Sequence, residues 1–338
     1  MANWQDNPFE FVYDGAITEN VPGEVNVRKV RYPSNGIEVV GYLYTPAGYD
    51  EAADGEYAAV SVAHPNGGTK EQVAGLYAQL LAEHGYVTLA ADAAYQGESA
   101  GEPHGTDQPF CRIEDVRRMV DYLKSVPGVD PQRVGSLGIC GGAGYTYAAA
   151  QSDKDIKAVA TLSLFNTGRV RRLGYGDTAA ATFAERLADA NAAREAEANG
   201  GEVAIVGFIP EMTDEERTEF EATTRANPGS LYTDGVIYYG FDYMHPRATG
   251  SYTKSSLVNL MMWDATDRAA LIDQPLLIIA GSRADSLYMS EEAYEKAIGT
   301  QDKELFIVGG ATHIDTYHVP AYVDQVEAKL VEFFGRTL

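Results

Sequence analysis

Apolar residues recur along the chain in two alternating patterns. One pattern consists of short, nearly continuous apolar runs, at residues 57–63, 86–91, 134–139, 156–165, 275–280 and 304–308. The other spaces apolar side chains at helical intervals, at residues 73–81, 113–123, 141–150 and 323–334. Buried strands that alternate with helices are typical of a parallel sheet covered on both faces. We therefore expect an α/β protein with a mostly parallel twisted sheet.

Two local signals refine this pattern. Residues 25–46 alternate apolar and polar positions around Asn35-Gly36, which predicts two antiparallel strands joined by a tight turn. Thr69 with Gln72, and Thr213 with Glu216, have the spacing of capping boxes, and each pair predicts the start of a helix.

The alternation stops between residues 166 and 274. This segment has polar, Ala- and Glu-rich helical stretches, followed by an aromatic-rich half over residues 231–263. We interpret it as a mainly helical lid or cap inserted into a core formed by residues 1–165 and 275–338. The aromatic side chains, Tyr239 and Tyr243 among them, are expected to line part of a substrate pocket, although they could also pack a small core of the insertion.

Charge excludes some classes of partner. The chain has 49 acidic and 26 basic residues, a formal net charge of −23. A phosphate backbone or an anionic membrane surface requires a basic face, so we expect neither nucleic acid nor membrane as a partner. The negative charge is spread along the chain and favours solubility.

Cysteine usage and the N-terminal sequence indicate the compartment. The two cysteines, Cys111 and Cys140, are too few for a disulfide framework or a cysteine-built zinc site. Neither a secretory signal pattern nor an apolar run of bilayer-spanning length is visible, so a cytoplasmic location is expected. The six histidines form no metal-binding motif, and we expect no metal and no cofactor.

The segment Gly138-Ile139-Cys140-Gly141-Gly142 carries candidate chemistry. It follows a predicted strand and precedes a predicted helix, as a nucleophile elbow does, with Cys140 at the tip. A thiol at a helix N-terminus is expected to ionise more easily. The alternative is that Cys140 is a small buried core residue.

These residues resemble the α/β-hydrolase superfamily, and the G-x-C-x-G elbow resembles its dienelactone-hydrolase-like branch, in which the nucleophile is Cys. The resemblance covers about residues 25–165 and 275–338. It implies a chain order of nucleophile, acid and histidine. Asp285 follows the strand at 275–280, and His313 follows the strand at 304–308, so both match that order. The implied triad is Cys140, His313 and Asp285, with Asp285 orienting His313 and His313 paired with the thiol.

The same resemblance suggests further site residues. The backbone N–H of Gly141 would stabilise an oxyanion, together with that of Asn66 or Gly67 in the loop after the strand at 57–63. The loop 92–99 resembles the family's D-x-R-G-x-G-x-S segment with substitutions, and its Tyr95 and Glu98 are expected to face the substrate.

Three other residues have competing interpretations. His64 is either structural or part of the pocket. His318 is a rival to His313 whose position favours the surface. Cys111 is expected to be inert.

The sequence therefore predicts a cofactor-free hydrolase of carboxylic esters, lactones or thioesters that acts through an acyl-cysteine on a small-molecule acyl substrate. An acyltransferase with the same triad is the alternative enzyme, and a non-catalytic ligand-binding protein of the same fold is the alternative outside catalysis. Proteins of this fold often dimerise, so a homodimer is one possible assembly.

Overall fold

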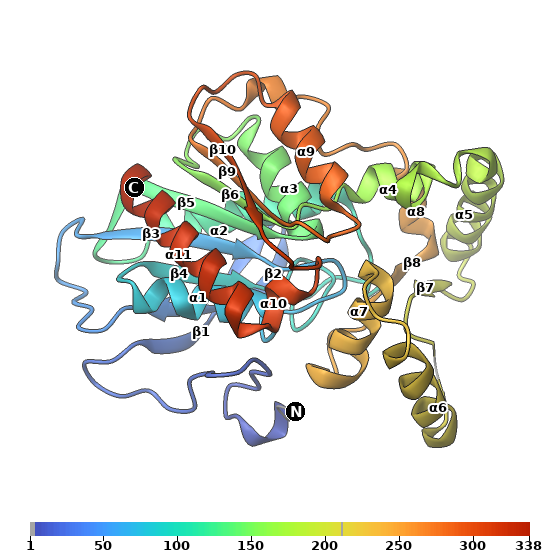
Figure 1. Cartoon of the computed structure of the whole chain (residues 1–338), viewed down its shortest axis with the longest axis horizontal. Helices are drawn as coiled ribbons and strands as arrows, with labels where there is room; N and C mark the ends of the chain where they lie inside the picture. Colours follow the sequence, from blue (N-terminus) through green and yellow to red (C-terminus); the bar gives the residue numbers. More distant parts are fainter. Residues whose placement is uncertain (1–3, 211) are drawn as a thin grey trace.

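A central eight-stranded sheet organises the chain (Figure 1). The computed structural model describes residues 4–210 and 212–338. The sheet order is β1-β2-β4-β3-β5-β6-β9-β10, and the strands from β4 to β10 in that order run parallel. The strands are β1 (Asn26–Ser34), β2 (Ile37–Thr45), β3 (Tyr57–Ala63), β4 (Val87–Ala91), β5 (Val129–Ile139), β6 (Val159–Leu162), β9 (Leu276–Gly281) and β10 (Lys303–Val308). The predicted mostly parallel sheet is confirmed.

The N-terminal hairpin forms as predicted. β1 and β2 pair antiparallel, with Ser34 opposite Ile37. Asn35 and Gly36 form the turn with φ values of 48° and 81°, a left-handed conformation that Asn and Gly adopt readily.

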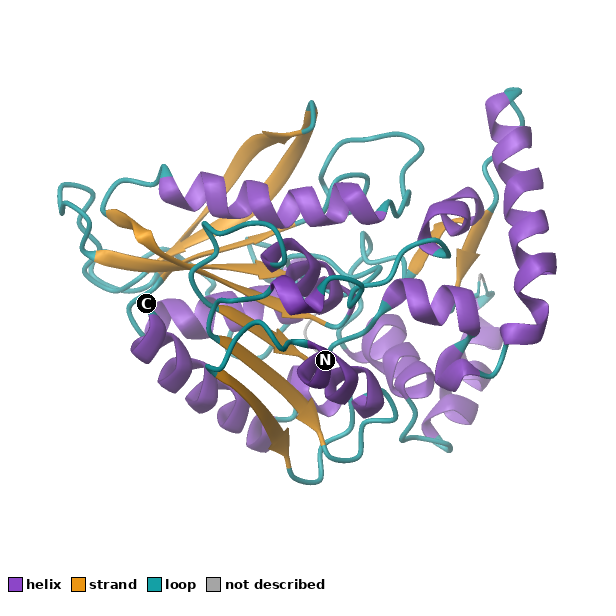
Figure 2. Ribbon diagram, turned by 90° about the horizontal axis from the view of Figure 1, so that it is seen from above, coloured by secondary structure: helices purple, strands orange, loops and turns teal. Residues whose placement is uncertain are grey.

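Helices cover both faces of the sheet, as Figure 2 shows. α1 (Val73–Glu83) packs beside α11 (Pro320–Thr337), whereas α2 (Pro109–Lys124) packs beside α3 (Gly141–Ala150). α9 (Leu287–Lys296) joins α3, because the Tyr147 hydroxyl donates to the Ala293 carbonyl at 2.7 Å. The short α10 (Asp315–His318) precedes α11. Both faces are thereby buried, which the continuous apolar strands require.

The chain between β6 and β9 forms further elements to one side of the sheet (Figure 1). They are α4 (Thr167–Leu173), α5 (Phe183–Ala198), β7 (Ile205–Gly207), α6 (Asp214–Arg225), α7 (Leu231–Ile237), β8 (Ser251–Thr253) and α8 (Leu257–Leu260). β6 and β9 are neighbouring parallel strands, so the segment leaves and re-enters the sheet at adjacent positions. Its division from the core as a lid stays a prediction.

Two local predictions differ from the structure. The Thr213–Glu216 capping box is present, but the Thr69–Gln72 pair makes only half of one: the Gln72 side chain accepts from the Thr69 N–H at 3.1 Å, and α1 begins later, at Val73. The strand predicted over 156–165 is limited to Val159–Leu162, because Ser163 has a φ of 50° and the chain turns out of the sheet.

No helix in the described ranges combines the length and apolar character that crossing a bilayer would need.

A buried ion cluster fixes the loop that follows β4. The Lys70 ammonium is fully buried and bonds the carboxylates of Glu71 at 2.6 Å, Asp92 at 2.7 Å and Glu98 at 2.8 Å. Asp92 also accepts from the backbone N–H groups of Lys70 and Glu98. Since a buried charge is costly without its partner, Lys70 holds this loop in place.

The Lys70→Met variant should therefore be strongly destabilised, because it leaves buried carboxylates without their counter-charge. We expect a loss of about 3–5 kcal/mol in the free energy of unfolding, measured by urea denaturation. Lys154→Met, which breaks the exposed Lys154–Asp273 ion pair, is the control and should cost about 0–1 kcal/mol. Equal losses in the two variants would contradict this interpretation.

Candidate active site

Cys140 occupies a sharp turn between β5 and α3. Its φ and ψ are 54° and −118°, a strained backbone conformation for a residue other than Gly. Four backbone hydrogen bonds hold it there: Cys140 N–H donates to Leu162 at 2.9 Å, and the Cys140 carbonyl accepts from Phe165 and Ala143, each at 3.0 Å, and from Gly144 at 3.3 Å. The structure therefore places Cys140 at the tip of an elbow.

Two glycines make the turn sterically possible. A Cβ on Gly138 would lie 2.5 Å from the Ala143 Cα, and one on Gly142 would lie 2.4 Å from the Ala63 carbonyl oxygen. Both contacts are with backbone atoms of neighbouring elements, which cannot move away cheaply. The close crossing of β5, α3 and β3 accounts for the glycines of the motif.

Two backbone N–H groups and one side-chain hydroxyl face the Cys140 sulfur. The N–H groups of Gly141 and Asn66 and the hydroxyl of Tyr317 each favour the thiolate by hydrogen bonding. Of the two residues proposed beside Gly141, the structure brings Asn66 to the sulfur. Gly67 instead lines a neighbouring cavity, where its carbonyl accepts from the Gly250 N–H at 3.2 Å.

Burial dominates the electrostatics of the thiol. It raises the pKa of Cys140 to about 11, against the lowering effects of Tyr317, Gly141, Asn66 and the Arg171 guanidinium. The expectation that the start of α3 makes the thiolate more accessible is therefore wrong for this state. Removing the negative charge from water destabilises the thiolate more than the hydrogen-bond donors stabilise it.

His313 lies in the loop after β10, fully buried. Its Nε2 bonds the Tyr317 hydroxyl at 3.0 Å, and its Nδ1 bonds the Ser286 hydroxyl at 2.6 Å. Burial lowers the pKa of His313 to about 3. The imidazole is therefore neutral at pH 7, with a hydroxyl group on each ring nitrogen.

Asp285 is not the hydrogen-bond partner of the His313 ring in this structure, contrary to the expected triad geometry. Its carboxylate accepts from the Leu231 N–H at 3.0 and 3.3 Å, at the beginning of α7. It also raises the pKa of Tyr175, after the larger effect of burial. The path of the loop places the next residue, Ser286, at the expected position of the acid, hydrogen-bonded to Nδ1 of His313.

A cavity of about 70 Å³ opens at the Cys140 thiol, and a second cavity of about 170 Å³ lies beside it. Both are lined by Asn66, Arg171, Phe208 and Tyr232. The first is mostly apolar, and its remaining lining residues are Pro65, Phe165, Leu231, Gly235, Tyr239, Ile314 and Tyr317. The segment between β6 and β9 thus supplies much of the wall.

Of the four residues predicted to contact the substrate, one lines the Cys140 cavity and the other three do not. Tyr239 lines the Cys140 cavity. Tyr243 lines another cavity, which Cys140 does not line, and its hydroxyl donates to Asp14 at 3.1 Å. Tyr95 lines a different hollow, and its ring packs over Gly101. The Glu98 carboxylate pairs with Lys29 and Lys70. These last three positions follow from the ion cluster and local packing, which motif spacing does not reveal.

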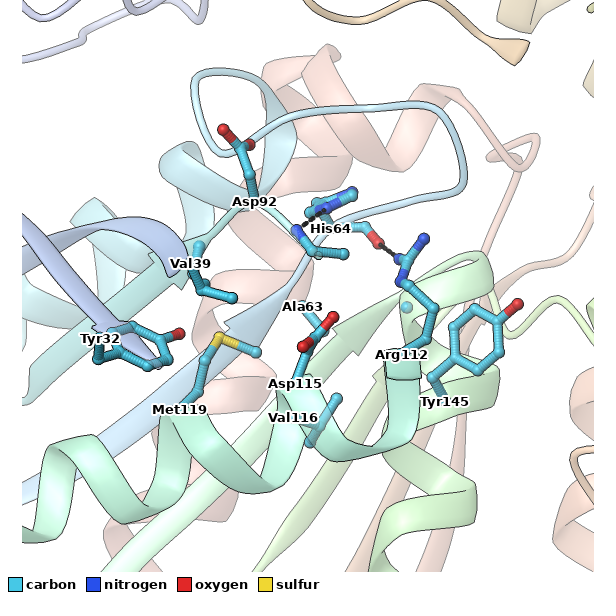
Figure 3. A pocket seen from close by; sticks show the side chains of 13 residues that line it. Tyr32, Val39, Ala63, His64, Asp92, Arg112, Asp115, Val116, Met119 and Tyr145 are labelled. Atoms are coloured by element: carbon cyan, nitrogen blue, oxygen red, sulfur yellow. Dashed lines mark hydrogen bonds between the residues drawn. The ribbon is translucent and has the colours of Figure 1, made fainter. Parts of the chain in front are cut away.

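The remaining candidates have structural surroundings. His64 is buried, with Nδ1 on the Pro65 carbonyl at 2.7 Å and Nε2 accepting from the Ala93 N–H at 3.0 Å. Figure 3 shows Arg112 bonded to the His64 carbonyl. Together with the two ring contacts of His64, this bond holds the loop that carries Asn66 in place. His318 packs against tyrosine rings away from Cys140. Cys111 belongs to α2.

Three functional candidates were missed by sequence reasoning. Tyr317 stands four residues after His313, a helical spacing that could have marked it. Ser286 directly follows the expected acid. Arg171 lies in α4, a segment whose sequence carries no recognisable motif. Its guanidinium lies 4.5 Å from the centre of the Tyr252 ring, and its buried Nε has no hydrogen-bond partner in the described ranges.

Among the residues that the structure describes, two groups of side chains lie close enough together to bind a metal ion: Glu10 with Glu71 and His245, and Glu71 with Asp92 and Glu98. Both lie at the buried ion cluster. The Lys70 ammonium and the Arg247 guanidinium already bond their carboxylates, so cationic side chains neutralise the charge there.

Alkylation of Cys140 should depend steeply on pH. In a Cys111→Ser variant, in which Cys140 is the sole thiol, the iodoacetamide rate should rise about tenfold per unit between pH 7 and 9, because the thiolate is the reactive form and the pKa is raised. An alkylation rate that levels off below pH 8 would contradict this prediction and would indicate a preformed thiolate–imidazolium pair.

Comparison with known proteins places the chain in a family. The family model described as the dienelactone hydrolase family matches residues 39–163. The uncharacterized protein YcjY of Escherichia coli is 38% identical over 304 residues, covering 89% of this chain and 95% of that protein. The thiohydrolase aneE of Aspergillus aculeatus is 27% identical over 154 residues, 46% of each chain.

A solved structure agrees with this assignment. The crystal structure of the hypothetical protein PA2218 from Pseudomonas aeruginosa has a TM-score of 0.81 and 31% identity, covering 93% of this chain and 94% of that one. The elbow, the sheet order and these similarities lead to one conclusion: the chain belongs to the dienelactone hydrolase family and has the α/β-hydrolase fold.

Proposed function

We propose that the protein hydrolyses activated acyl compounds, namely esters, lactones or thioesters, through an acyl-Cys140 intermediate. The observation that carries this proposal is the Cys140 thiol at the elbow tip, facing both the N–H groups of Gly141 and Asn66 and an open cavity. This arrangement offers a nucleophile and an oxyanion site at the same point.

The steps follow from that geometry. The sulfur attacks the carbonyl carbon of the substrate, and the carbonyl electron pair moves to oxygen, where the Gly141 and Asn66 N–H groups can donate to it. The bond to the leaving group breaks with its electron pair, the leaving group departs with the proton that the thiol has lost, and the acyl group remains on Cys140. Water then attacks the carbonyl carbon of this thioester, with His313 as the base that receives a proton of the water. The C–S bond breaks with its electron pair, and the sulfur takes that proton back from His313, which restores the thiol and releases the acid.

The reactivity of sulfur narrows the substrate class. A thiolate attacks well but also leaves well, so the tetrahedral intermediate returns to substrate unless the substrate's own leaving group is good. Activated esters, enol-lactones and thioesters meet this condition better than amides. The apolar side chains of Phe165, Leu231 and Ile314 around Cys140 suit an apolar acyl group. The similarity to a thiohydrolase supports including thioesters.

Replacing the nucleophile tests the proposal. Cys140→Ala should lower turnover of a p-nitrophenyl ester and an acyl thioester by at least about 10³-fold, because the covalent step is lost. Cys111→Ala removes the other free cysteine, on α2, and should leave turnover unchanged. Unchanged turnover in Cys140→Ala would rule out the acyl-cysteine mechanism.

The same assay separates the alternatives. If the acyl group is recovered on an added alcohol or amine and little free acid forms, the protein is an acyltransferase. If the wild-type protein turns over neither substrate but binds acyl compounds, it is a non-catalytic ligand-binding protein.

Residues 285 and 286 give a paired test of how His313 is oriented. Ser286→Ala should lower kcat/KM about tenfold, since it removes the hydrogen bond at Nδ1 that orients the ring. Asp285→Asn should change it less than about threefold, because an amide oxygen can still accept from the Leu231 N–H. The reverse order would indicate that Asp285 turns to His313 during catalysis and acts as the triad acid.

A further inference from the structure

Tyr317 lies between the two groups that are expected to exchange a proton. Its hydroxyl bonds Nε2 of His313 at 3.0 Å and also interacts with the Cys140 thiol. It lines the same cavity as Cys140. The order of groups is therefore Cys140, Tyr317, His313 and Ser286, with a phenol where a nucleophile and its base usually touch.

The tyrosine is firmly held in that position. It is 1% exposed, and its ring packs edge-on against Tyr238, with 5.5 Å between ring centroids and 84° between planes. α10 is anchored as well, because the Tyr77 hydroxyl donates to the Thr316 carbonyl at 2.6 Å. A packed ring on an anchored helix is a poor candidate for a side chain that swings aside in each turnover.

The two groups on either side of Tyr317, Cys140 and His313, are both neutral at pH 7. Burial raises the pKa of the Cys140 thiol and lowers that of the His313 imidazole. No ion pair is stored at rest, so the thiol proton has to leave while the sulfur attacks. When Nδ1 carries the imidazole proton and donates to Ser286, Nε2 accepts from the Tyr317 hydroxyl. The phenol oxygen is then available to the thiol proton.

We propose that Tyr317 is a catalytic residue that relays the thiol proton of Cys140 to Nε2 of His313 during acylation and returns it to the leaving group. The inference rests on the proposed function.

In acylation the S–H bond breaks and its proton joins the phenol oxygen, while the phenol proton moves to Nε2. The S–C bond forms, and the carbonyl electron pair moves to oxygen. When the C=O bond re-forms, the bond to the leaving group breaks with its electron pair. The leaving group takes the phenol proton, and Nε2 returns its proton to the phenol.

Burial also raises the pKa of Tyr317 well above that of free tyrosine. A free phenolate would therefore be costly, and the two proton transfers must occur together. The relay therefore transfers two protons in one transition state. This should be visible in the solvent deuterium isotope effect, and a tyrosine that only fills space would not produce it.

The first test is Tyr317→Phe, which removes one oxygen and keeps the ring. The expected result is a fall in kcat/KM for a p-nitrophenyl ester of about 10²–10³-fold, the usual contribution of general acid–base groups. The matched control is Tyr238→Phe, which removes a hydroxyl from the ring packed against Tyr317 and leaves the relay intact. It should stay within about threefold of wild type.

The second test uses the wild-type protein and so does not depend on a variant folding. Rates measured across mixtures of H₂O and D₂O should curve with the deuterium fraction, as two moving protons require. A straight line, or Tyr317→Phe activity within about threefold of wild type, would overturn the relay. Cys140→Ala tests the nucleophile separately. If Cys140→Ala loses activity and Tyr317→Phe keeps wild-type activity, the relay is rejected and the acyl-cysteine mechanism stands.

Discussion

The strained backbone of Cys140 is the constraint on which the site depends. A residue with a φ of 54° is tolerated only where its surroundings hold it. Here β6, α3 and Phe165 supply those restraints through their backbone hydrogen bonds to Cys140, and glycines allow the elements to cross closely. The strain directs the thiol out of the sheet into the cavity, beside the N–H groups of Gly141 and Asn66. The rest of the fold serves to keep that turn in place.

Burial then sets the chemical state of the site. The same packing that fixes Cys140 and His313 removes them from water, so the neutral forms are favoured on both. A site in this state cannot rely on a stored thiolate, and its reactivity has to arise when the substrate carbonyl develops negative charge at the N–H donors. The hydroxyl groups of Tyr317 and Ser286 suit that condition, because they conduct or hold a proton without carrying charge themselves.

Much of the fold could be predicted from the sequence, because the signals are local or periodic. Apolar runs located the strands, Asn35-Gly36 located the hairpin, and the glycines around Cys140 located the elbow. The elbow motif indicated Cys140 as the candidate nucleophile and chain order indicated His313, and in the structure the Tyr317 hydroxyl interacts with both. The chain segment between β6 and β9, which supplies much of the cavity wall, has no recognisable motif. The sequence therefore did not indicate Arg171 as a site residue.

The errors have a common physical origin. Asp285 and Ser286 are adjacent, and only the path of the loop decides which of them faces His313. Glu98 was expected in the pocket, but the buried Lys70 ammonium holds its carboxylate. Such outcomes depend on tertiary contacts between residues far apart in the chain, and spacing along the sequence carries no information about them.

Trapping of the acyl-enzyme tests the central claim most directly. Wild-type protein mixed with an activated ester and quenched in acid within the first turnovers should gain the mass of one acyl group. Peptide mapping should place that mass on Cys140. Acid released with no adduct, or an adduct on a residue other than Cys140, would contradict the account.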